Sequence, residues 1–205
     1  MMNPAESPLK SRRKPVQQRS RMTQTAILDA FVRLLVEKGY SRLTIRDIAL
    51  VAGVGLGTVY EYFPSKKSIA AHCIYQRFKG VGASMLACID ARRGSPLSEM
   101  AEAILDGMLE LHSQHTEEWS ALIFLERQIS DAAAYQALYG HIAGIWAQAF
   151  SASGDIEQYT GKSHDVVHAS VYGLLYQRLM TAPETVPGTE FRQQLRALVL
   201  GYLLS

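Results

Sequence analysis

The sequence predicts an all-α protein. Its apolar residues recur at spacings of three and four along most of the chain, and no segment alternates in the period-two pattern of a strand. Helix start signals such as Ser95-Pro96 and Ser130-Asp131 separate these periodic segments. A chain of 205 residues, 48 % of them hydrophobic, can bury a core in one small and one larger domain. We predict an N-terminal arm over residues 1–21, a first domain over 22–67 and a second domain over 68–205.

The N-terminal arm is basic and almost free of large apolar residues. Its basic residues are Lys10, Arg12, Arg13, Lys14, Arg19 and Arg21. Because Pro4, Pro8 and Pro15 interrupt the arm and little apolar surface is available for burial, we predict that it is disordered in isolation. Two roles remain open for it, namely contacts with phosphates or the minor groove of DNA, and a solubilising tail.

Charge is distributed unevenly along the chain. Residues 1–67 contain 12 Lys and Arg against 5 Asp and Glu, a net charge of +7. The remainder has a net charge of −5, which leaves +2 for the whole chain. Such asymmetry is expected when one end of a protein meets a polyanion and the other does not.

Residues 44–62 have the pattern of two short helices joined by a tight turn. One apolar face of the first helix is formed by Ile45, Ile48, Ala49 and Ala52. Gly53 then ends this helix, because glycine readily takes the positive φ that a tight turn requires. Val54 and Val59 can fold back onto the first helix. A pair of helices of this kind, with the second exposed, is a helix-turn-helix whose second helix can enter the major groove.

Several motifs in this part of the chain occur in one register. They are Ile27–Leu35, Gly39-Tyr40, Asp47-Ile48-Ala49, Ala52-Gly53-Val54, Gly57-Thr58-Val59-Tyr60 and Tyr62-Phe63-Pro64-Ser65-Lys66. On these motifs, residues 25–66 resemble the DNA-binding domain of the TetR family of bacterial transcriptional regulators. The resemblance implies DNA contacts at Thr44, Arg46, Leu56, Gly57, Thr58, Tyr60, Tyr62 and Lys66. Two residues depart from the family pattern: Gly55 replaces the usual serine, and Lys67 stands where an acidic residue is common.

Lys66 also has a physical argument for a phosphate contact. Ser65 is placed to cap the next helix, so Lys66 falls in the first turn, where a cation opposes the helix dipole. A phosphate bound to the lysine and the free amide groups would turn that cost into a gain. The alternative is an ordinary solvated surface lysine.

Beyond Lys66 the pattern predicts further helices and one longer loop. The helices are expected over 66–91, from Ser95 as cap and Pro96 as first residue through 111, from 116 through 129, from Ser130-Asp131 through 150, over 163–180 and over 189–204. Residues 151–161 read as a loop, and Pro183 and Pro187 separate the last two helices. The family resemblance implies that these two helices form a homodimer interface. Their apolar stripes alone would suit an intramolecular core equally well.

The resemblance also implies a small-molecule pocket among the middle helices. The candidate ligand-binding residues are Met100, Ile104, Met108, Trp119, Ile123, Phe124, Tyr135, Trp146 and Tyr172. Methionine and aromatic side chains suit a hydrophobic or aromatic effector. Helical stripes of this composition also form plain hydrophobic core, so this alternative stays open.

The sequence favours a regulator over an enzyme. It contains no G-x-S-x-G nucleophile elbow and no H-E-x-x-H zinc motif, so we predict no catalytic residues and no cofactor. The pairs His112/His115 and His164/His168 could each offer two nitrogen ligands, but a structural metal site usually needs four, and we predict none. Cys73 and Cys88 lie on one predicted helix, too far apart to form a disulfide within it.

The predicted function is therefore that of a ligand-responsive, sequence-specific DNA-binding regulator. As a homodimer it would recognise a palindromic double-stranded operator, and a small molecule would release it, as for a repressor. The N-terminus has no apolar stretch typical of a secretory signal, and no segment of about twenty apolar residues indicates a membrane span, so we expect a cytoplasmic protein. A helical protein-interaction module without DNA binding is the alternative.

Overall fold

The computed structural model describes residues 13–205, with side chains from Gln18 onward. In this part of the chain every regular element is a helix, so the predicted all-α class is confirmed. The α-helices are α1 (Arg13–Arg42), α2 (Ile45–Ala52), α3 (Leu56–Tyr62), α4 (Lys66–Ala91), α5 (Leu97–Ser113), α6 (Thr116–Ile129), α7 (Ala132–Ala152), α8 (His164–Thr181) and α9 (Thr189–Leu204). Two 3-10 helices, η1 (Ile156–Tyr159) and η2 (Pro183–Thr185), precede α8 and α9. Between residues 13 and 205, no helix has the length and apolar character needed to span a membrane.

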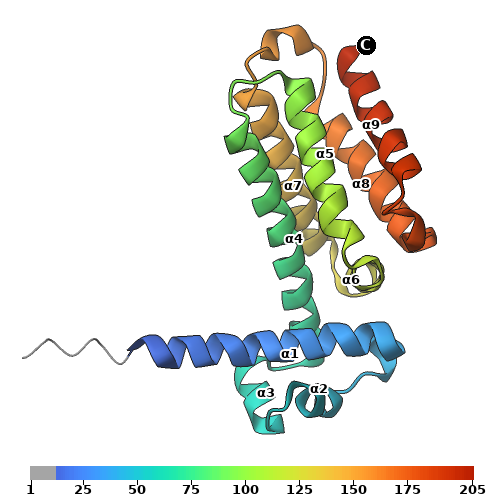
Figure 1. Ribbon diagram of the computed structural model, residues 1–205. Helices are drawn as coiled ribbons and strands as arrows, with labels where there is room; N and C mark the ends of the chain where they lie inside the picture. Colours follow the sequence, from blue (N-terminus) through green and yellow to red (C-terminus); the bar gives the residue numbers. More distant parts are fainter. Residues whose placement is uncertain (1–12) are drawn as a thin grey trace, which may run out of the picture.

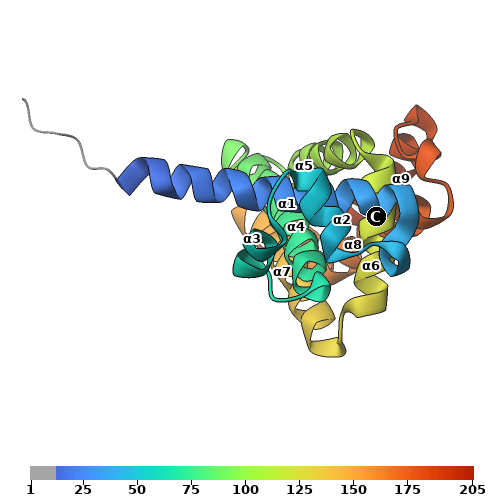
Figure 2. The ribbon, with the colours of Figure 1, turned by 90° about the horizontal axis from the view of Figure 1, so that it is seen from below.

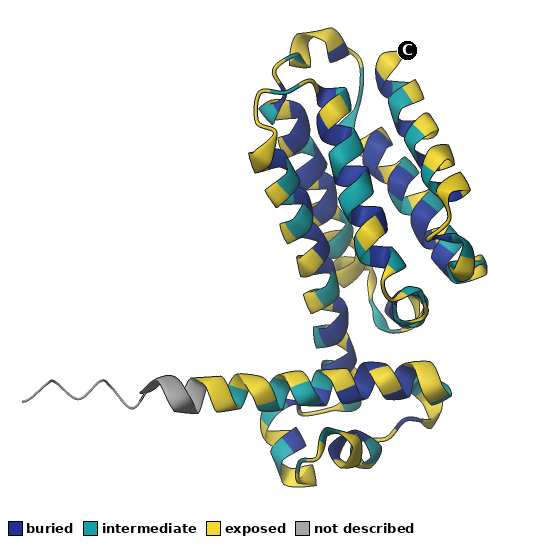
Figure 3. Ribbon diagram, in the orientation of Figure 1, coloured by how far each residue is buried: buried dark blue, intermediate teal, exposed yellow. Residues whose placement is uncertain are grey.

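The helices form two groups that share α4. Helix α1 lies across the lower end of α4, with α2 and α3 beneath it, and α5 and α7–α9 rise on the other side (Figure 1). The view from below shows α2 and α3 in front of the rest of the molecule (Figure 2). Helix α4 packs on α1 at one end and on α5, α6 and α7 along the rest of its length, with the buried faces turned inward (Figure 3). A displacement of α4 would therefore be felt in both groups.

Helix α1 begins earlier than the sequence indicates. The structure has helical backbone from Arg13, so the prediction of disorder is wrong for residues 13–21, whereas residues 1–12 lie outside the described part. Pro15 does not prevent this, because the first turn of a helix needs no backbone N–H donors there. The predicted stop at Gly39-Tyr40 coincides with a break in the helical conformation, since Gly39 has φ 75° and ψ 161°.

Two predicted helix caps are confirmed and a third is wrong. Ser65 accepts a hydrogen bond from the Ser68 amide, and Asp131 accepts one from the Ala134 amide. Ser95 does not cap α5, which begins at Leu97 with Pro96 as its cap residue. The Leu97 amide instead donates to Asp155 Oδ1 at 2.8 Å, an acceptor 58 residues away in sequence. Such a long-range cap has no local sequence pattern.

The predicted loop 151–161 closes the end of the larger domain. Helix α7 extends to Ala152, and η1 occupies residues 156–159 of the predicted loop. The amide of Gly94 donates to Ala152 O at 2.8 Å, and the amide of Gly154 donates to Ser95 O at 3.0 Å. A Cβ at position 154 would lie 2.2 Å from Gly94 O, so only glycine fits this close approach.

The buried His112 makes stability depend on pH. Its Nδ1 lies 2.6 Å from Met108 O, its ring lies 4.1 Å from that of Trp119, and burial lowers its pKa to about 4. In the unfolded chain His112 binds a proton near pH 6.5, whereas in the folded protein it binds one only near pH 4. The free energy of unfolding should therefore fall as pH drops from 6.5 to 4, by up to about 1.4 kcal/mol per pH unit.

Thermal unfolding between pH 4 and 7 tests this expectation. His112→Leu should flatten the dependence of Tm on pH, although His168 retains part of it because burial lowers its pKa in the same direction. His115→Leu is the matched control, since His115 is exposed. An equal slope in both variants would show that His112 does not carry the effect.

Candidate DNA-binding surface and ligand cavity

Helices α2 and α3 form the predicted helix-turn-helix. Gly53 has φ 67° and ψ 31°, in the left-handed region, and the Val54 amide donates to Ala49 O at 3.0 Å to close the turn. Ile48 and Val59 are fully buried, which fixes α3 against α2. The confirmed turn thus places α3 at a defined angle on the outside of the domain.

A capping box fixes the start of α2. Thr44 Oγ1 accepts from the Asp47 amide at 3.2 Å, and Asp47 Oδ2 accepts from the Thr44 amide at 2.9 Å. Lys38 donates to the same Asp47 oxygen at 2.7 Å. The Lys38 hydrogen bond, followed by those from Thr44, lowers the pKa of Asp47 to about 2. This anchors the entry of α2 to the end of α1.

The outer face of α3 is open to solvent. Leu56 is 39 % and Tyr60 51 % exposed, Gly57 is exposed, and Thr58 is half-buried. A Cβ at Gly57 would have no atom within 4 Å. A short helix presented in this way, with polar and aromatic side chains and no covering element, is the geometry that a major-groove reading helix requires.

Three other predicted contact residues lie around this helix. Arg46 is exposed in the first turn of α2. Thr44 is exposed too, but its hydroxyl already serves the capping box. Tyr62, at the end of α3, is half-buried and donates from its hydroxyl to Ser20 Oγ at 3.0 Å, which ties α3 to α1.

Lys66 turns inward. Its Nζ donates to Tyr40 O at 2.8 Å and to Leu43 O at 2.9 Å, and lies 4.3 Å from the centre of the Tyr40 ring. These carbonyl groups follow the Gly39 break and precede α2. The lysine therefore joins the first turn of α4 to the end of α1, an arrangement that neither sequence interpretation of Lys66 contains.

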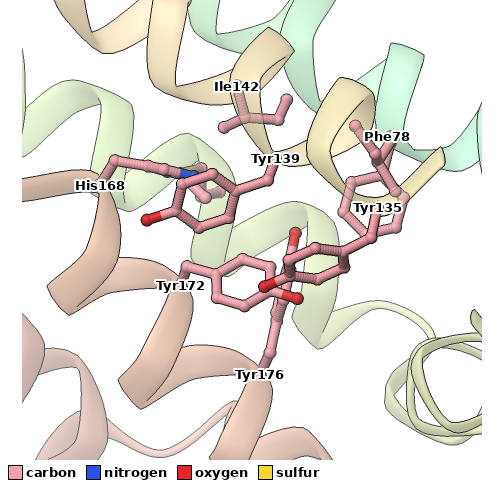
Figure 4. A pocket seen from close by; sticks show the side chains of 9 residues that line it. Phe78, Tyr135, Tyr139, Ile142, His168, Tyr172 and Tyr176 are labelled. Carbon is pink, nitrogen blue, oxygen red and sulfur yellow. The ribbon is translucent and has the colours of Figure 1, made fainter. Parts of the chain in front are cut away.

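A small cavity lies inside the larger domain, among α4, α5, α7 and α8. We call it the tyrosine cavity, and its lining consists of Phe78, Met108, Tyr135, Leu138, Tyr139, Ile142, His168, Tyr172 and Tyr176. The side chains of Tyr135, Tyr172 and Tyr176 converge within it (Figure 4). The cavity has a volume of about 10 Å³, so as it stands it holds at most one water. A larger ligand would have to displace part of the lining.

His168 brings an unsatisfied polar atom to the tyrosine cavity. The residue is 2 % exposed, its Nε2 has no hydrogen-bond partner, and its ring lies 4.3 Å from that of Tyr139. Burial lowers its pKa to about 4, so the ring is neutral at neutral pH. A neutral imidazole nitrogen of this kind can form one hydrogen bond with a ligand.

A larger groove separates the first half of α7 from α4. It measures about 440 Å³. Its α4 side carries Lys67, Ala71, Ile74, Tyr75 and Lys79, and its other side is formed by residues 129–131 together with Ala134, Ala137, Leu138 and His141. Leu138 lines both the groove and the tyrosine cavity. This half of α7 therefore stands between two spaces.

The predicted ligand-binding residues include part of the cavity lining. Of the nine predicted ligand-binding residues, Met108, Tyr135 and Tyr172 line it. Five others, namely Met100, Ile104, Trp119, Ile123 and Trp146, are buried core residues outside the lining, and Phe124 is 46 % exposed. The prediction missed Tyr139, His168 and Tyr176. Their spacing at 135/139 and 168/172/176 was visible as two aromatic stripes of helical period.

The paired histidines do not come together as metal ligands. His112 is buried whereas His115 is exposed, and His168 is buried whereas His164 lies beside Asp165 at 3.6 Å. Among residues 18–205, no group of three His, Cys, Asp or Glu side chains is arranged to hold a metal ion. Cys73 and Cys88 are free thiols.

Comparison with known proteins identifies the family of the first domain. Residues 27–73 match the family of bacterial regulatory proteins named after TetR, and this segment includes every predicted DNA-contact residue. Residues 27–73 therefore form an N-terminal domain of the TetR family. This is a family of DNA-binding transcription regulators and not of enzymes.

A curated relative of the helix-turn-helix type is similar to part of the chain. An uncharacterized HTH-type transcriptional regulator from Lactococcus lactis subsp. lactis is 35 % identical over 94 residues, which are 46 % of this chain and 47 % of that protein. The match thus spans about half the length of the curated relative.

Solved structures of bacterial regulators share the fold over most of the chain. A TetR family transcription regulator from Marinobacter aquaeolei VT8 superposes with a TM-score of 0.73 at 17 % identity, covering 91 % of this chain and 98 % of that one. The fatty acid degradation regulator FadR from Bacillus halodurans also gives 0.73, at 14 % identity, over 88 % and 94 %. FadR from Bacillus subtilis, solved in complex with stearoyl-CoA, gives 0.70 at 17 % identity, over 87 % and 97 %.

Proposed function

We propose that this TetR-family protein binds a palindromic operator as a homodimer and is released from it by a small molecule, as a repressor. The observation that carries the proposal is the exposed α3, held by the Gly53 turn and covered by no other described element. The excess positive charge of residues 1–67 supports DNA as the partner of this end.

The outward faces of α8 and α9 suit the predicted dimer. Val166, Ala169 and Gly173 are exposed along one side of α8, and Leu198 and Gly201 are exposed on α9. Small and apolar side chains at these positions let two helix pairs approach closely across a two-fold axis. Such a dimer would present two α3 helices to successive major grooves, about 34–36 Å apart.

Helix α4 is the proposed route from effector to DNA. Phe78 of α4 lines the tyrosine cavity, while Lys66 at its start holds the carbonyl groups of Tyr40 and Leu43. A ligand that enlarges the cavity would move α4 relative to α7, and the Lys66 contacts would carry that movement to α1 and α2. The effector can shift binding only by its differential affinity for the two arrangements. The stearoyl-CoA complex of the Bacillus subtilis FadR supports a small-molecule site in this fold.

Selection of genomic DNA fragments by the purified full chain tests the proposal. We expect a short inverted repeat, bound by a dimer, with affinity that falls steeply as salt concentration rises. Release of that fragment by a compound pool would support repression by effector binding. Weak, sequence-indifferent binding under all conditions would contradict the proposal and favour the protein-interaction module.

A further inference from the structure

The lining of the tyrosine cavity carries no formal charge. Its polar groups are four tyrosine hydroxyls and the neutral His168, and its lining contains no Lys, Arg, Asp or Glu. The aromatic rings lie close together, with 4.6 Å between the centroids of Tyr172 and Tyr176 and 5.3 Å between those of Tyr139 and Tyr172. Tyrosine rings present negative potential on their faces, which attracts cations.

A buried carboxylate lies on α6, a helix that packs on α8. Glu126 of α6 is 3 % exposed, its Oε1 has no hydrogen-bond partner, and it forms no ion pair with any residue from 18 to 205. Helix α6 packs on α8, which supplies Tyr172 and Tyr176. Burial is the main cause of the raised pKa of both tyrosines, and the charge of Glu126 raises it further. The carboxylate and both rings therefore belong to two helices that pack on each other.

A buried carboxylate without a partner is costly in its ionised form, and a neighbouring positive charge offsets that cost. Asp165, an exposed acid in the first turn of α8, adds a second negative charge, and this charge acts to raise the pKa of Tyr139 and of His168. Arg127 opposes these charges, because it acts to lower the pKa of Tyr172. The electrostatic surroundings thus favour a positive ligand and disfavour a negative one.

From this arrangement we infer that the effector is an organic cation with a hydrophobic body. Its ammonium group lies against the tyrosine faces, donates to His168 Nε2 and is balanced by Glu126. Its body contacts the apolar lining, including Phe78 and Met108. The inference rests on the proposed function, because it assumes that the tyrosine cavity is the effector site. It separates this chain from the FadR neighbour that was solved with an anionic coenzyme A ester.

The first half of α7 provides the way in. Residues 131–137 are all exposed, so this half is held by few interior contacts, and the 440 Å³ groove gives it space to move toward α4. Farther along, α7 closes on α4, since a Cβ at Gly82 would lie 3.0 Å from both His141 and Ile145. The cavity can therefore open by a movement of Tyr135 and its neighbours while the rest of α7 stays packed. The groove carries two lysines, Lys67 and Lys79, against one acid, Asp131, so its net positive charge disfavours the same cation and leaves the cavity as its site.

Three naphthalene probes that differ in charge test the inference on the full chain. They are 2-naphthylmethylammonium, 2-naphthylmethanol and 2-naphthoate, and their dissociation constants can be measured by calorimetry. We expect the cation to bind about tenfold more tightly than the alcohol, with the carboxylate weakest. Equal or tighter binding of the carboxylate, or no binding by any probe, would overturn the inference.

Substitutions in and near the cavity test where the cation binds. Glu126→Gln should weaken binding of the cation about tenfold and leave binding of the alcohol unchanged. Glu110 is an exposed acid on α5, so Glu110→Gln should change the affinity for neither probe. Tyr172→Leu should weaken binding of the cation, whereas Tyr172→Phe, which keeps the ring face, should bind it nearly as tightly as the unmodified chain. An unchanged cation affinity in Glu126→Gln would contradict the inference, and the probe series on the unmodified chain decides the matter if that variant does not fold. Operator binding is measured separately. If the chain binds its operator but prefers the carboxylate probe, this inference is wrong and the proposed function still stands.

Discussion

Gly57→Glu should abolish tight operator binding without harming the fold. Gly57 lies in the first turn of α3, is exposed, and has no atom within 4 Å of where a Cβ would stand. Glutamate is a better helix former than glycine, and an acid in the first turn is favourable to the helix dipole, so stability should be equal or higher. The same carboxylate would face the phosphates of bound DNA. We expect a loss of roughly 100-fold in affinity, equivalent to about 2.7 kcal/mol.

Gly80→Glu is the matched control for this variant. Gly80 is an exposed glycine within α4, also with nothing within 4 Å of its Cβ position, and the substitution makes the same change in net charge. Fluorescence anisotropy with the selected operator, at several salt concentrations, should show little change for Gly80→Glu. Similar losses in the two variants would mean that net charge, and not the face of α3, governs binding.

The helix-turn-helix was predictable because its determinants are local. Gly53, the capping pattern of Thr44 and Asp47, and the inward-facing Ile48 and Val59 all lie within sixteen residues, and each acts on its near neighbours. The remaining helices were predictable for the same reason, from apolar periodicity and from caps such as Asp131. The start of α5 was misplaced because its partner, Asp155, comes from another part of the chain.

The tyrosine cavity was less predictable because it depends on how the helices pack. Trp119 and Trp146 suit a ligand pocket by composition, but each is at most 1 % exposed within the core. Tyr139 and His168 meet only because α7 packs on α8, at a ring distance of 4.3 Å. Periodicity predicts which face of a helix is buried, yet it cannot tell which buried residues border a space. Likewise, the acceptors of Lys66 lie 23 and 26 residues earlier in the chain.

Lys66→Met should destabilise the protein and weaken the response to effector. The substitution removes two charged hydrogen bonds, at 2.8 and 2.9 Å, and leaves the carbonyl groups of Tyr40 and Leu43 without this donor. Charged hydrogen bonds contribute about 1.5–3 kcal/mol each, so we expect a loss of at least about 2 kcal/mol and a fall in Tm of roughly 4–8 °C. Since these bonds join α4 to the end of α1, a ligand should also change operator affinity less than in the unmodified chain.

The adjacent lysine separates this structural role from a phosphate contact. Lys67→Met makes the same change in charge, and Lys67 is exposed and has no hydrogen bond or ion pair within residues 18–205, so its Tm should be unaffected. A lysine that contacts phosphate contributes about one unit to the slope of log affinity against log salt. If Lys66 joins α4 to α1, its loss lowers Tm and leaves this slope unchanged. If Lys66→Met instead keeps its Tm and loses about one unit of slope, the lysine swings out to bind DNA, and the route through α4 must use other contacts.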